Sequence, residues 1–314
     1  MAEKIVVVAG PTASGKTALG IALAKDFNGE IVSADSMQVY RGMDIGTAKA
    51  SLAEREGIPH HMLDVAEPWE DYSVARYVEQ AEACCRDILR RGKLPILVGG
   101  TGLYIDSLVS GRDFAAVDGD QGLREALSAE YDALGGEAMH RRLQEIDPER
   151  AAILHSGDKR RIVRALEVYR LTGMTITEHD RQTRALPRRF DAAAIHLNFK
   201  NRAALYARID RRVDMMVEQG LFREVEGLLA AGLSPESTAM QAIGYKEAVR
   251  SLQGELRREE AVALIKQASR RYAKRQLTWF NRDKEALPIL WEDEPDFEYA
   301  RRLSTEFLHS RGLS

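Results

Sequence analysis

Cysteine and long hydrophobic runs are both scarce in this sequence. Its two cysteines, Cys84 and Cys85, are adjacent and by themselves supply neither a disulfide framework nor a zinc site. They lie in a helical pattern that predicts burial, and their scarcity indicates a reducing cytoplasm. The apolar run at residues 5–9 is too short for a signal sequence or a membrane span, and no later segment is long enough. We therefore expect a cytoplasmic protein without a membrane partner.

An overall positive charge is also missing. The 314 residues are 45% hydrophobic and 30% charged, with a net charge of −3, which is typical of one large or two modest domains and argues against a general nucleic-acid coat. The charge is nevertheless uneven, because residues 159–189 hold nine Lys/Arg against three acids and residues 266–284 hold seven against one. Two basic segments indicate a localised anionic partner, although such runs also occur on solvated helix faces.

The most informative motif follows the first expected strand. The apolar run 5–9 leads into a segment that matches G-x-x-x-x-G-K-T and opens a helix. In this context the backbone N–H groups of the loop bind phosphate at a helix N-terminus. Lys16 is expected to reach the terminal phosphates, and the Thr17 hydroxyl to help hold Mg²⁺. The predicted diphosphate- or nucleotide-binding residues are Gly10, Pro11, Thr12, Ala13, Ser14, Gly15, Lys16 and Thr17.

Strand and helix signals alternate over the first hundred residues. Strands are expected at 4–9, 30–34 and 94–98, with a weak candidate at 60–65, and helices at 15–27 and 73–91. Ser73 is the expected N-cap of the second helix. The alternation predicts an α/β fold with a doubly wound parallel sheet, which binds ligands at the carboxyl ends of its strands.

The rest of the chain is mainly helical. A Gly/Asp-rich linker at 113–122 precedes helices expected at 123–134, 138–145, 148–154 and 159–172, which we interpret as an insertion. A strand at 192–199 returns to the sheet, and helices are expected at 202–219, 222–231, 241–252 and 259–281. We predict a core of residues 1–113 and 190–290 with a helical C-terminal part, an all-helical insertion at 114–189, and a weakly structured tail at 291–314.

Two polar residues follow the second expected strand. Asp35 comes directly after residues 30–34, and a carboxylate at this edge of the sheet faces the ligand crevice. It can bind Mg²⁺ or act as a general base, while its structural alternative is to cap the following turn. Gln38 carries an amide that can form two hydrogen bonds with one edge of a purine, as glutamine does when it binds adenine.

A glycine-rich turn follows the strand expected at 94–98. Gly99 and Gly100 leave room for a bulky group, or only make a tight turn, and Thr101 places a hydroxyl near the phosphates. The strand ends without an acidic residue, although a phosphoryl-transfer enzyme is expected to hold Mg²⁺ with an acid near such a position. This absence counts against a kinase.

Seven segments, in order, resemble the successive motifs of the tRNA dimethylallyltransferase family. They are residues 10–17, 35–40, 46–49, 97–104, 161–168, 243–247 and 272–280. The first is generic, but the others are specific in combination. The resemblance implies a P-loop-kinase-like core with a helical insertion. It also implies transfer of a dimethylallyl group from dimethylallyl diphosphate to N6 of the adenosine 3′ of the anticodon, in tRNAs that read codons starting with U. Without a Cys/His module, the resemblance is to the bacterial form.

The resemblance implies roles at the reaction centre. Asp35 is the general base for N6, and Thr101 holds the reacting oxygen or the N6 group. Lys16, with Mg²⁺ on Thr17, stabilises the leaving diphosphate, and Asp35 is the second candidate ligand of this metal. A diphosphate arginine is implied at Arg212, with Arg208 as the alternative. The two lie one turn apart on one expected helix, where a structural salt bridge is an equally open role.

The resemblance also implies a surface that binds tRNA. A stacked base must be flipped out of the anticodon loop before its N6 can reach a buried carbon centre. Tyr245 is expected to stack, Lys246 to contact phosphate, and two basic faces to position the anticodon stem-loop. The implied tRNA-binding residues are Asp35, Ser36, Met37, Gln38, Thr101, Arg124, Arg160, Arg161, Ile162, Val163, Arg164, Gln241, Ala242, Ile243, Gly244, Tyr245, Lys246, Arg270, Lys274 and Arg275.

Three other functions stay open on the sequence alone. An adenylate dimethylallyltransferase, acting on free AMP, ADP or ATP, would share the phosphate loop, Asp35 and Thr101 but would have little use for two basic helices. A small-metabolite kinase would need a base site and an arginine-bearing lid. A non-catalytic RNA-binding protein would not need an intact phosphate loop beside Asp35. We expect a monomer, since no long apolar stripe is left unexplained.

Overall fold

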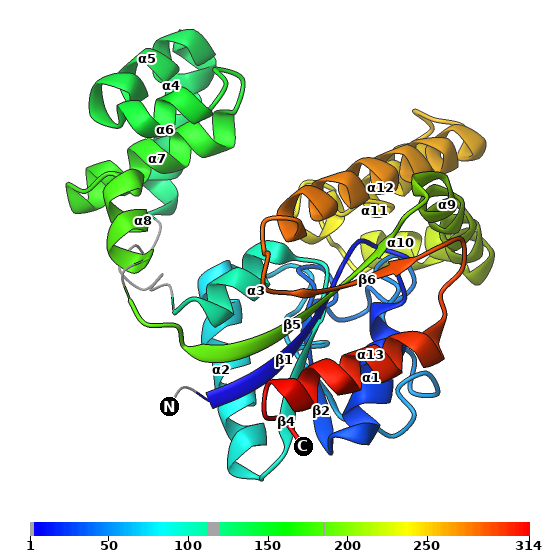
Figure 1. The fold of residues 1–314 in the computed structure, drawn as a ribbon. Coiled ribbons are helices and arrows are strands. Elements are labelled where there is room, and N and C mark those ends of the chain that lie inside the picture. Colours follow the sequence, from blue (N-terminus) through cyan, green and yellow to red (C-terminus); the bar gives the residue numbers. More distant parts are fainter. Residues whose placement is uncertain (1–2, 112–119, 185) are drawn as a thin grey trace. The chain divides into compact units, whose positions relative to one another are not determined.

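A computed structural model of the protein describes residues 3–111, 120–184 and 186–314. The chain divides into two compact units, shown in Figure 1. The first, here called the sheet unit, comprises Met1–Val109 and Arg189–Ser314, and the second, the helical unit, comprises Ser110–Arg188. The expected insertion at 114–189 overlaps the helical unit, whereas most of the expected linker at 113–122 lies outside the described residues.

The sheet unit is built on six parallel strands in the order β3-β2-β4-β1-β5-β6. They are β1 (Glu3–Ala9), β2 (Gly29–Ala34), β3 (His60–His61), β4 (Leu94–Gly99), β5 (Phe190–Phe199) and β6 (Leu287–Trp291). Strands β2 and β4 are buried along their whole length, as strands covered on both faces must be. The predicted α/β fold is confirmed, although the weak strand candidate at 60–65 shortens to two residues.

Helices cover the sheet and hold its core. Helix α1 (Lys16–Asp26) and helix α13 (Phe297–Ser310) lie side by side in Figure 1. Their side chains share one hydrophobic core with β1, in which Leu19, Val8 and Leu308 are all buried. Helix α2 (Val74–Arg90) and helix α3 (Gly102–Val109) pack together. As predicted, Ser73 caps α2, accepting a hydrogen bond from the Arg76 N–H at 3.1 Å.

The remaining helices of the sheet unit pack on one another. They are α9 (Arg202–Gln219), α10 (Leu221–Ala230), the 3-10 turn η1 (Ala239–Gln241), α11 (Tyr245–Leu252) and α12 (Arg258–Phe280). Among them, α9, η1 and α12 line a cavity at the carboxyl ends of the strands. The helix expected at 241–252 begins only at Tyr245. Gly244 before it has φ of +98°, a conformation that favours glycine, and its N–H donates to Glu247 Oε2 at 2.8 Å.

The helical unit has its own core. Its helices are α4 (Gln121–Leu134), α5 (Gly136–Ile146), α6 (Pro148–Ile153), α7 (Lys159–Thr172) and α8 (Ile176–Arg184). Leu127, Leu143, Ile162 and Leu166 are each at most 1% exposed and form the centre of this core. No strand occurs among the described residues of this unit, in agreement with the sequence pattern.

The C-terminal segment is well structured, so the expectation of a weakly structured tail is wrong. Strand β6 pairs with β5, with Leu287 beside Ile195 and Trp291 beside Phe199. Along β6, only Ile289 and Trp291 are buried. The strand is short and lies at the edge of the sheet, so it lacks the continuous apolar run of the central strands. The residues from 287 onward therefore belong to the sheet unit.

The cysteines and the hydrophobic segments, both scarce in the sequence, are placed in the structure as expected. Cys85 is buried and Cys84 is half-buried, and burial raises the pKa of the Cys85 thiol to about 12. Within the described part of the chain, none of the helices combines the length and the apolar character needed to cross a membrane.

Candidate active site

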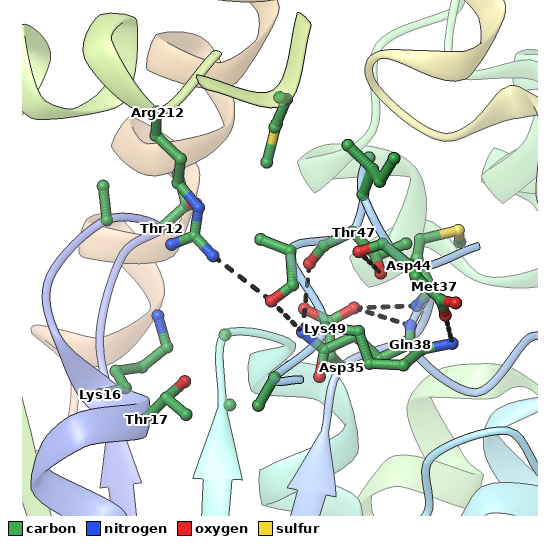
Figure 2. Close-up of a pocket in the computed structure, with 18 of the residues that line it drawn as sticks. Thr12, Lys16, Thr17, Asp35, Met37, Gln38, Asp44, Thr47, Lys49 and Arg212 are labelled. Atoms are coloured by element: carbon green, nitrogen blue, oxygen red, sulfur yellow. Dashed lines mark hydrogen bonds and ion pairs between the residues drawn. The ribbon is translucent and has the colours of Figure 1, made fainter. Parts of the chain in front are cut away.

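A cavity of about 1510 Å³ lies at the carboxyl ends of β1, β2 and β4, the edge at which parallel sheets bind ligands. Its wall includes the phosphate loop after β1, the turn after β2, the segment 44–56 and parts of α9 and α12. All of these belong to the sheet unit. Figure 2 shows the side chains around the space between the phosphate loop and the segment 44–49.

The phosphate loop is fixed by hydrogen bonds to its own backbone. The Pro11 carbonyl accepts from Lys16 Nζ at 2.6 Å and from Ser14 Oγ at 2.8 Å. The Thr12 N–H donates to Gln276 Oε1 at 2.9 Å. This backbone N–H is therefore bound by a side chain of α12 and is not free for a ligand. Gly15 precedes α1 with φ of +88°, a left-handed conformation suited to glycine.

Lys16 and Arg212 bring two cations to the cavity. Figure 2 shows both side chains pointing into the space beside the phosphate loop. Burial, together with the charge of Arg212, lowers the pKa of Lys16 to about 7, against the opposing effect of Asp35. Burial likewise lowers the pKa of Arg212, against the opposing charges of Asp35 and Glu54. Neither cation forms an ion pair within the described residues, so an anionic ligand would relieve the cost of their desolvation.

Arg208 and Arg212, the two alternatives for the diphosphate arginine, have different surroundings. Arg208 pairs with Glu294 and donates from Nε to the Ala13 carbonyl at 3.3 Å. Arg212 instead makes a single long contact of 3.5 Å with the Ala48 carbonyl. The salt bridge weighed from the sequence thus belongs to Arg208, and Arg212 is the better candidate for a diphosphate.

Asp35 caps the following turn, the structural role that was weighed from the sequence, with one of its two oxygens. Its Oδ1 accepts from the N–H groups of Met37 at 2.9 Å and Gln38 at 3.3 Å, which closes a turn of the type that aspartate commonly makes. No hydrogen bond in the described part of the chain uses Oδ2, and Asp35 lines the cavity. One carboxylate oxygen is therefore structural, and the other is available for a proton or a metal.

Thr101 is directed at the same turn. Its Oγ1 accepts from the Ser36 N–H at 3.1 Å and lies 3.5 Å from Ser36 Oγ. Ser36 and Tyr272 line the cavity. Burial and the charge of Asp35 raise the pKa of Tyr272 to about 12, opposed by hydrogen bonds of its hydroxyl to Thr101 and Gln276. These hydroxyl groups form a polar cluster beside the carboxylate.

The glycines after β4 make room for the protein itself. A Cβ on Gly99 would lie 2.2 Å from the Ala34 carbonyl oxygen, and one on Gly100 would lie 2.2 Å from Gln276 Nε2. A Cβ on Gly102 would likewise lie 2.3 Å from the Trp279 ring. The idea that Gly99 and Gly100 leave space for a bulky ligand is therefore wrong: the space is taken by β2 and α12.

Comparison with known proteins identifies the family. The IPP transferase model matches residues 38–283, and an isopentenyl transferase model matches residues 3–67. The chain belongs to the IPP transferase family. Similar proteins include the tRNA dimethylallyltransferase of Caldanaerobacter subterraneus subsp. tengcongensis, 48% identical over 310 residues that cover 98% of each chain. That of Carboxydothermus hydrogenoformans is 49% identical over 293 residues, 93% of each chain.

Solved structures agree with this assignment. The full-length tRNA isopentenylpyrophosphate transferase from Bacillus halodurans matches with a TM-score of 0.73 and 40% identity, covering 99% of this chain and 98% of that chain. A eukaryotic dimethylallyltransferase acting on tRNA matches with a TM-score of 0.83 and 31% identity, covering 98% of this chain and 80% of that chain. The resemblance found in the sequence motifs is thus confirmed for the family.

The tRNA-binding residues implied by the family motifs fall on both units. Those that line the cavity are Asp35, Ser36, Met37, Gln38, Gln241, Ala242, Ile243 and Arg275. In the helical unit, Arg160 and Arg161 on α7 are exposed and form no ion pair among the described residues. Lys274 on α12 is exposed in the same way, and Lys246 is 44% exposed at 3.9 Å from Glu247.

Three apolar or aromatic contacts with tRNA need correction. Ile162 and Val163 are 0% and 4% exposed in the core of the helical unit, so their side chains hold α7 in place instead of meeting RNA. Tyr245 is also fully buried, and its hydroxyl donates to Glu224 Oε1 at 2.5 Å. A side chain enclosed in this way cannot stack on a base.

Three implied phosphate contacts are occupied by acidic partners of the protein itself. Arg124 and Arg164 bind the two oxygens of Glu167 at 3.0 and 2.9 Å, and that carboxylate is fully buried. Arg270 binds Asp210 at 2.5 Å. Asp210 offsets the charge of Arg270, and the single Glu167 carboxylate offsets one of the two charges of Arg124 and Arg164. The structure thus gives all three arginines a structural role.

Gln38 also differs from its expected role. Its Oε1 accepts from Ser33 Oγ at 3.1 Å, and its Nε2 donates to the Thr47 carbonyl at 3.1 Å. With both ends of the amide engaged, bidentate bonding to a purine would require these bonds to break. We conclude that Gln38 supports the cavity wall by tying the segment 46–49 to β2.

Two supporting residues were missed from the sequence. Lys49 is 3% exposed and binds Asp44 and Asp64, each at 2.6 Å. The Glu224 carboxylate accepts hydrogen bonds from the backbone N–H groups of residues 44, 45 and 46, at 2.9, 2.8 and 3.1 Å. The motif 46–49 pointed to this segment, but its partner Glu224 lies some 180 residues away along the chain, so no local pattern reveals it.

Proposed function

We propose that this protein transfers a dimethylallyl group from dimethylallyl diphosphate to N6 of the adenosine 3′ of the anticodon, in tRNAs that read codons starting with U. Diphosphate is the second product. The observation that carries the proposal is one cavity in which Lys16 and Arg212 face an anion site beside the carboxylate of Asp35. Membership of the IPP transferase family and similarity to tRNA dimethylallyltransferases support it.

The donor half of the reaction belongs to the phosphate loop. Breaking the allylic carbon–oxygen bond leaves positive charge on carbon and negative charge on the departing diphosphate. Lys16 and Arg212 are half-buried and lack ion partners among the described residues, so they are available to stabilise this developing charge. The binding of an anion also favours the charged form of Lys16, whose pKa lies near 7 in the free protein.

Mg²⁺ is the metal that we propose for this site. Thr17 and Asp35 both line the cavity, and no hydrogen bond among the described residues uses Oδ2 of Asp35. Among the described residues, no cluster of three or more His, Cys, Asp or Glu forms a protein-only metal site. This donor set fits Mg²⁺, which commonly binds one or two protein oxygens together with substrate phosphates. Bound there, the metal would neutralise charge on the diphosphate.

The acceptor half centres on Asp35. Adenine N6 is a weak nucleophile that must lose a proton as the new carbon–nitrogen bond forms. Oδ2 of Asp35 is free to accept that proton, while Oδ1 stays fixed by the turn. Thr101, Ser36 and Tyr272 supply hydroxyl groups next to this carboxylate, and we assign them to holding the flipped base.

Exposed cations in both units fit an anionic RNA partner. Arg160 and Arg161 on α7, and Lys274 on α12, form no ion pairs among the described residues. We propose that they bind phosphates of the anticodon stem-loop, which positions the loop without determining its sequence. We propose a monomer as the active form, and a cytoplasmic location stays a prediction.

The test is a product analysis. The protein is incubated with dimethylallyl diphosphate and Mg²⁺, together with unmodified tRNA, a bare anticodon stem-loop, or AMP, and the nucleosides are identified by mass. We expect N6-dimethylallyladenosine only in the two RNA reactions. Efficient prenylation of AMP without prenylation of tRNA would instead identify an adenylate dimethylallyltransferase. Phosphoryl transfer from ATP to a small acceptor, without prenylation, would identify a kinase.

A further inference from the structure

The segment that follows α12 reaches back to the phosphate loop at successive positions. Trp291, at the end of β6, donates its indole N–H to the Ser14 carbonyl at 2.9 Å. Glu294 pairs with Arg208, whose Nε donates to the carbonyl of Ala13 at 3.3 Å. Two neighbouring carbonyl groups of the loop are therefore held by residues far away in the sequence.

Phe297 completes this contact. Its ring meets the Trp291 ring edge-on, with 5.8 Å between the centroids. A Cβ added to Gly15 would lie only 2.9 Å from the same phenyl ring, so the aromatic pair is packed directly against the loop. Trp291 is 2% exposed, and the Ser14 carbonyl is thus the partner that satisfies its buried N–H.

The direction of these bonds has a consequence for ligand binding. A trans peptide unit is planar, and its C=O and N–H point in opposite directions. The peptide unit that carries the Ser14 carbonyl also carries the Gly15 N–H. Because Trp291 holds the carbonyl toward its indole ring, the Gly15 N–H points away from Trp291. In the same way, Arg208 orients the Ser14 N–H through the Ala13 carbonyl. Ser14 and Gly15 both line the cavity, and no hydrogen bond among the described residues uses either N–H.

We propose that Trp291 is a positioning residue, which aims the Gly15 N–H at the diphosphate by holding the Ser14 carbonyl. Arg208 with Glu294 does the same for the Ser14 N–H, more weakly. This inference rests on the proposed function of the loop as a diphosphate site. Because both peptide units are already oriented in the free protein, ligand binding does not carry the free-energy cost of reorienting them.

The test compares two tryptophans that each donate an indole hydrogen bond of 2.9 Å. Trp291→Phe keeps an aromatic ring but removes the donor to Ser14, whereas Trp279→Phe removes a donor to Asp106 on α3. Binding of Mg²⁺–pyrophosphate to the full-length protein is measured by calorimetry, with thermal unfolding and tRNA binding in parallel. We expect about fivefold to tenfold weaker pyrophosphate binding for Trp291→Phe, the scale of one hydrogen bond. Trp279→Phe should bind it like the wild type, and tRNA affinity should not change in either variant.

A second pair of variants keeps the proposal testable if Trp291→Phe does not fold. Glu294→Gln weakens the hold on Arg208, while Glu292→Gln removes a pair with Lys200 in the same exposed segment. We expect about twofold to fourfold weaker pyrophosphate binding for Glu294→Gln and an unchanged affinity for Glu292→Gln. Wild-type affinity in a folded Trp291→Phe, or equal effects in the second pair, would overturn the inference alone. Failure of the wild type to bind pyrophosphate would overturn the proposed donor site as well.

Discussion

The side-chain oxygen of Gln276 accepts the backbone N–H of Thr12 at 2.9 Å. Its Nε2 donates to the Gly100 carbonyl, also at 2.9 Å, and the side chain is buried. One amide on α12 therefore joins the phosphate loop to the turn after β4. That turn carries Thr101, which bonds to Ser36, so Gln276 connects the proposed donor side of the cavity to its acceptor side.

Replacing Gln276 by leucine should affect stability and turnover together. The substitution leaves the buried Gly100 carbonyl and the partly buried Thr12 N–H without partners, and a buried group left unpaired costs about 1–3 kcal/mol. We expect the free energy of unfolding to fall by about 2 kcal/mol or more, measured by chemical denaturation, with at least a tenfold lower turnover, roughly the scale of a misplaced reaction centre. Gln267→Leu, on an exposed side chain of the same helix, is the control. Equal effects of the two substitutions would show that the bridge is unimportant.

Asp35→Asn separates the two oxygens of that carboxylate. An asparagine oxygen can still accept from Met37 and Gln38, so the turn is kept, but the group facing the cavity can no longer take a proton. We expect turnover on tRNA to fall by about 10²-fold or more, with tRNA affinity unchanged in a filter-binding assay. If the variant instead lost Mg²⁺-dependent donor binding and recovered its rate in excess metal, Asp35 would be a metal ligand and not the base.

Lys16 should make diphosphate binding dependent on pH. Its pKa is lowered to about 7 in the free protein, and a bound anion raises it, so binding takes up protons above pH 7. Affinity for Mg²⁺–pyrophosphate should therefore decrease as the pH rises from 7 to 9. Calorimetry at pH 8 in buffers of different ionisation enthalpy measures the uptake. Lys16→Met removes the contribution of this group, and the same proton uptake in that variant would assign it to another group or to the ligand.

The sequence was most informative where function depends on neighbours in the chain. The phosphate loop and Asp35 lie at strand ends that hydrophobic runs predict directly, because parallel strands end at one edge of the sheet. Arg212 could not be separated from Arg208 in this way, since the choice depends on Glu294, 86 residues from Arg208.

Other functional features depend on partners that no local pattern contains. Tyr245 looks like an accessible aromatic in a basic motif, but Glu224 and the packing of α11 bury it. Strand β6 has too short an apolar pattern to be expected on its own, because it gains its partner only beside β5. In each case tertiary contacts overruled a reasonable local interpretation.

Glu167 should be a main source of stability in the helical unit. This carboxylate is fully buried and binds both Arg124 and Arg164. Glu167→Ala removes the partner of two arginines that are themselves 51% and 39% exposed. Because water can solvate both cations afterwards, we expect a loss of about 1–3 kcal/mol in unfolding free energy, the scale of hydrogen bonds to a charged group. Asp132→Ala, which removes the exposed partner of Lys159, should cost less than about 1 kcal/mol. Urea denaturation measures both losses. An equal, small loss in the two variants would show that Glu167 is not important for stability.

Lys274 and Arg270 lie one turn apart on α12 and should respond differently to salt. Lys274 is exposed and lacks an ion partner among the described residues, whereas Arg270 is held by Asp210 at 2.5 Å. If Lys274 binds a tRNA phosphate, Lys274→Ala lowers the slope of log affinity against log salt by about 0.7–0.9. Arg270→Ala should reduce protein stability with a smaller change in slope, because its charge is already neutralised by Asp210. Filter binding over a salt series measures both slopes, with Arg161→Ala as a parallel variant in the helical unit. Unchanged slopes for Lys274→Ala and Arg161→Ala, combined with efficient prenylation of AMP, would refute tRNA as the substrate and leave the free nucleotide in its place.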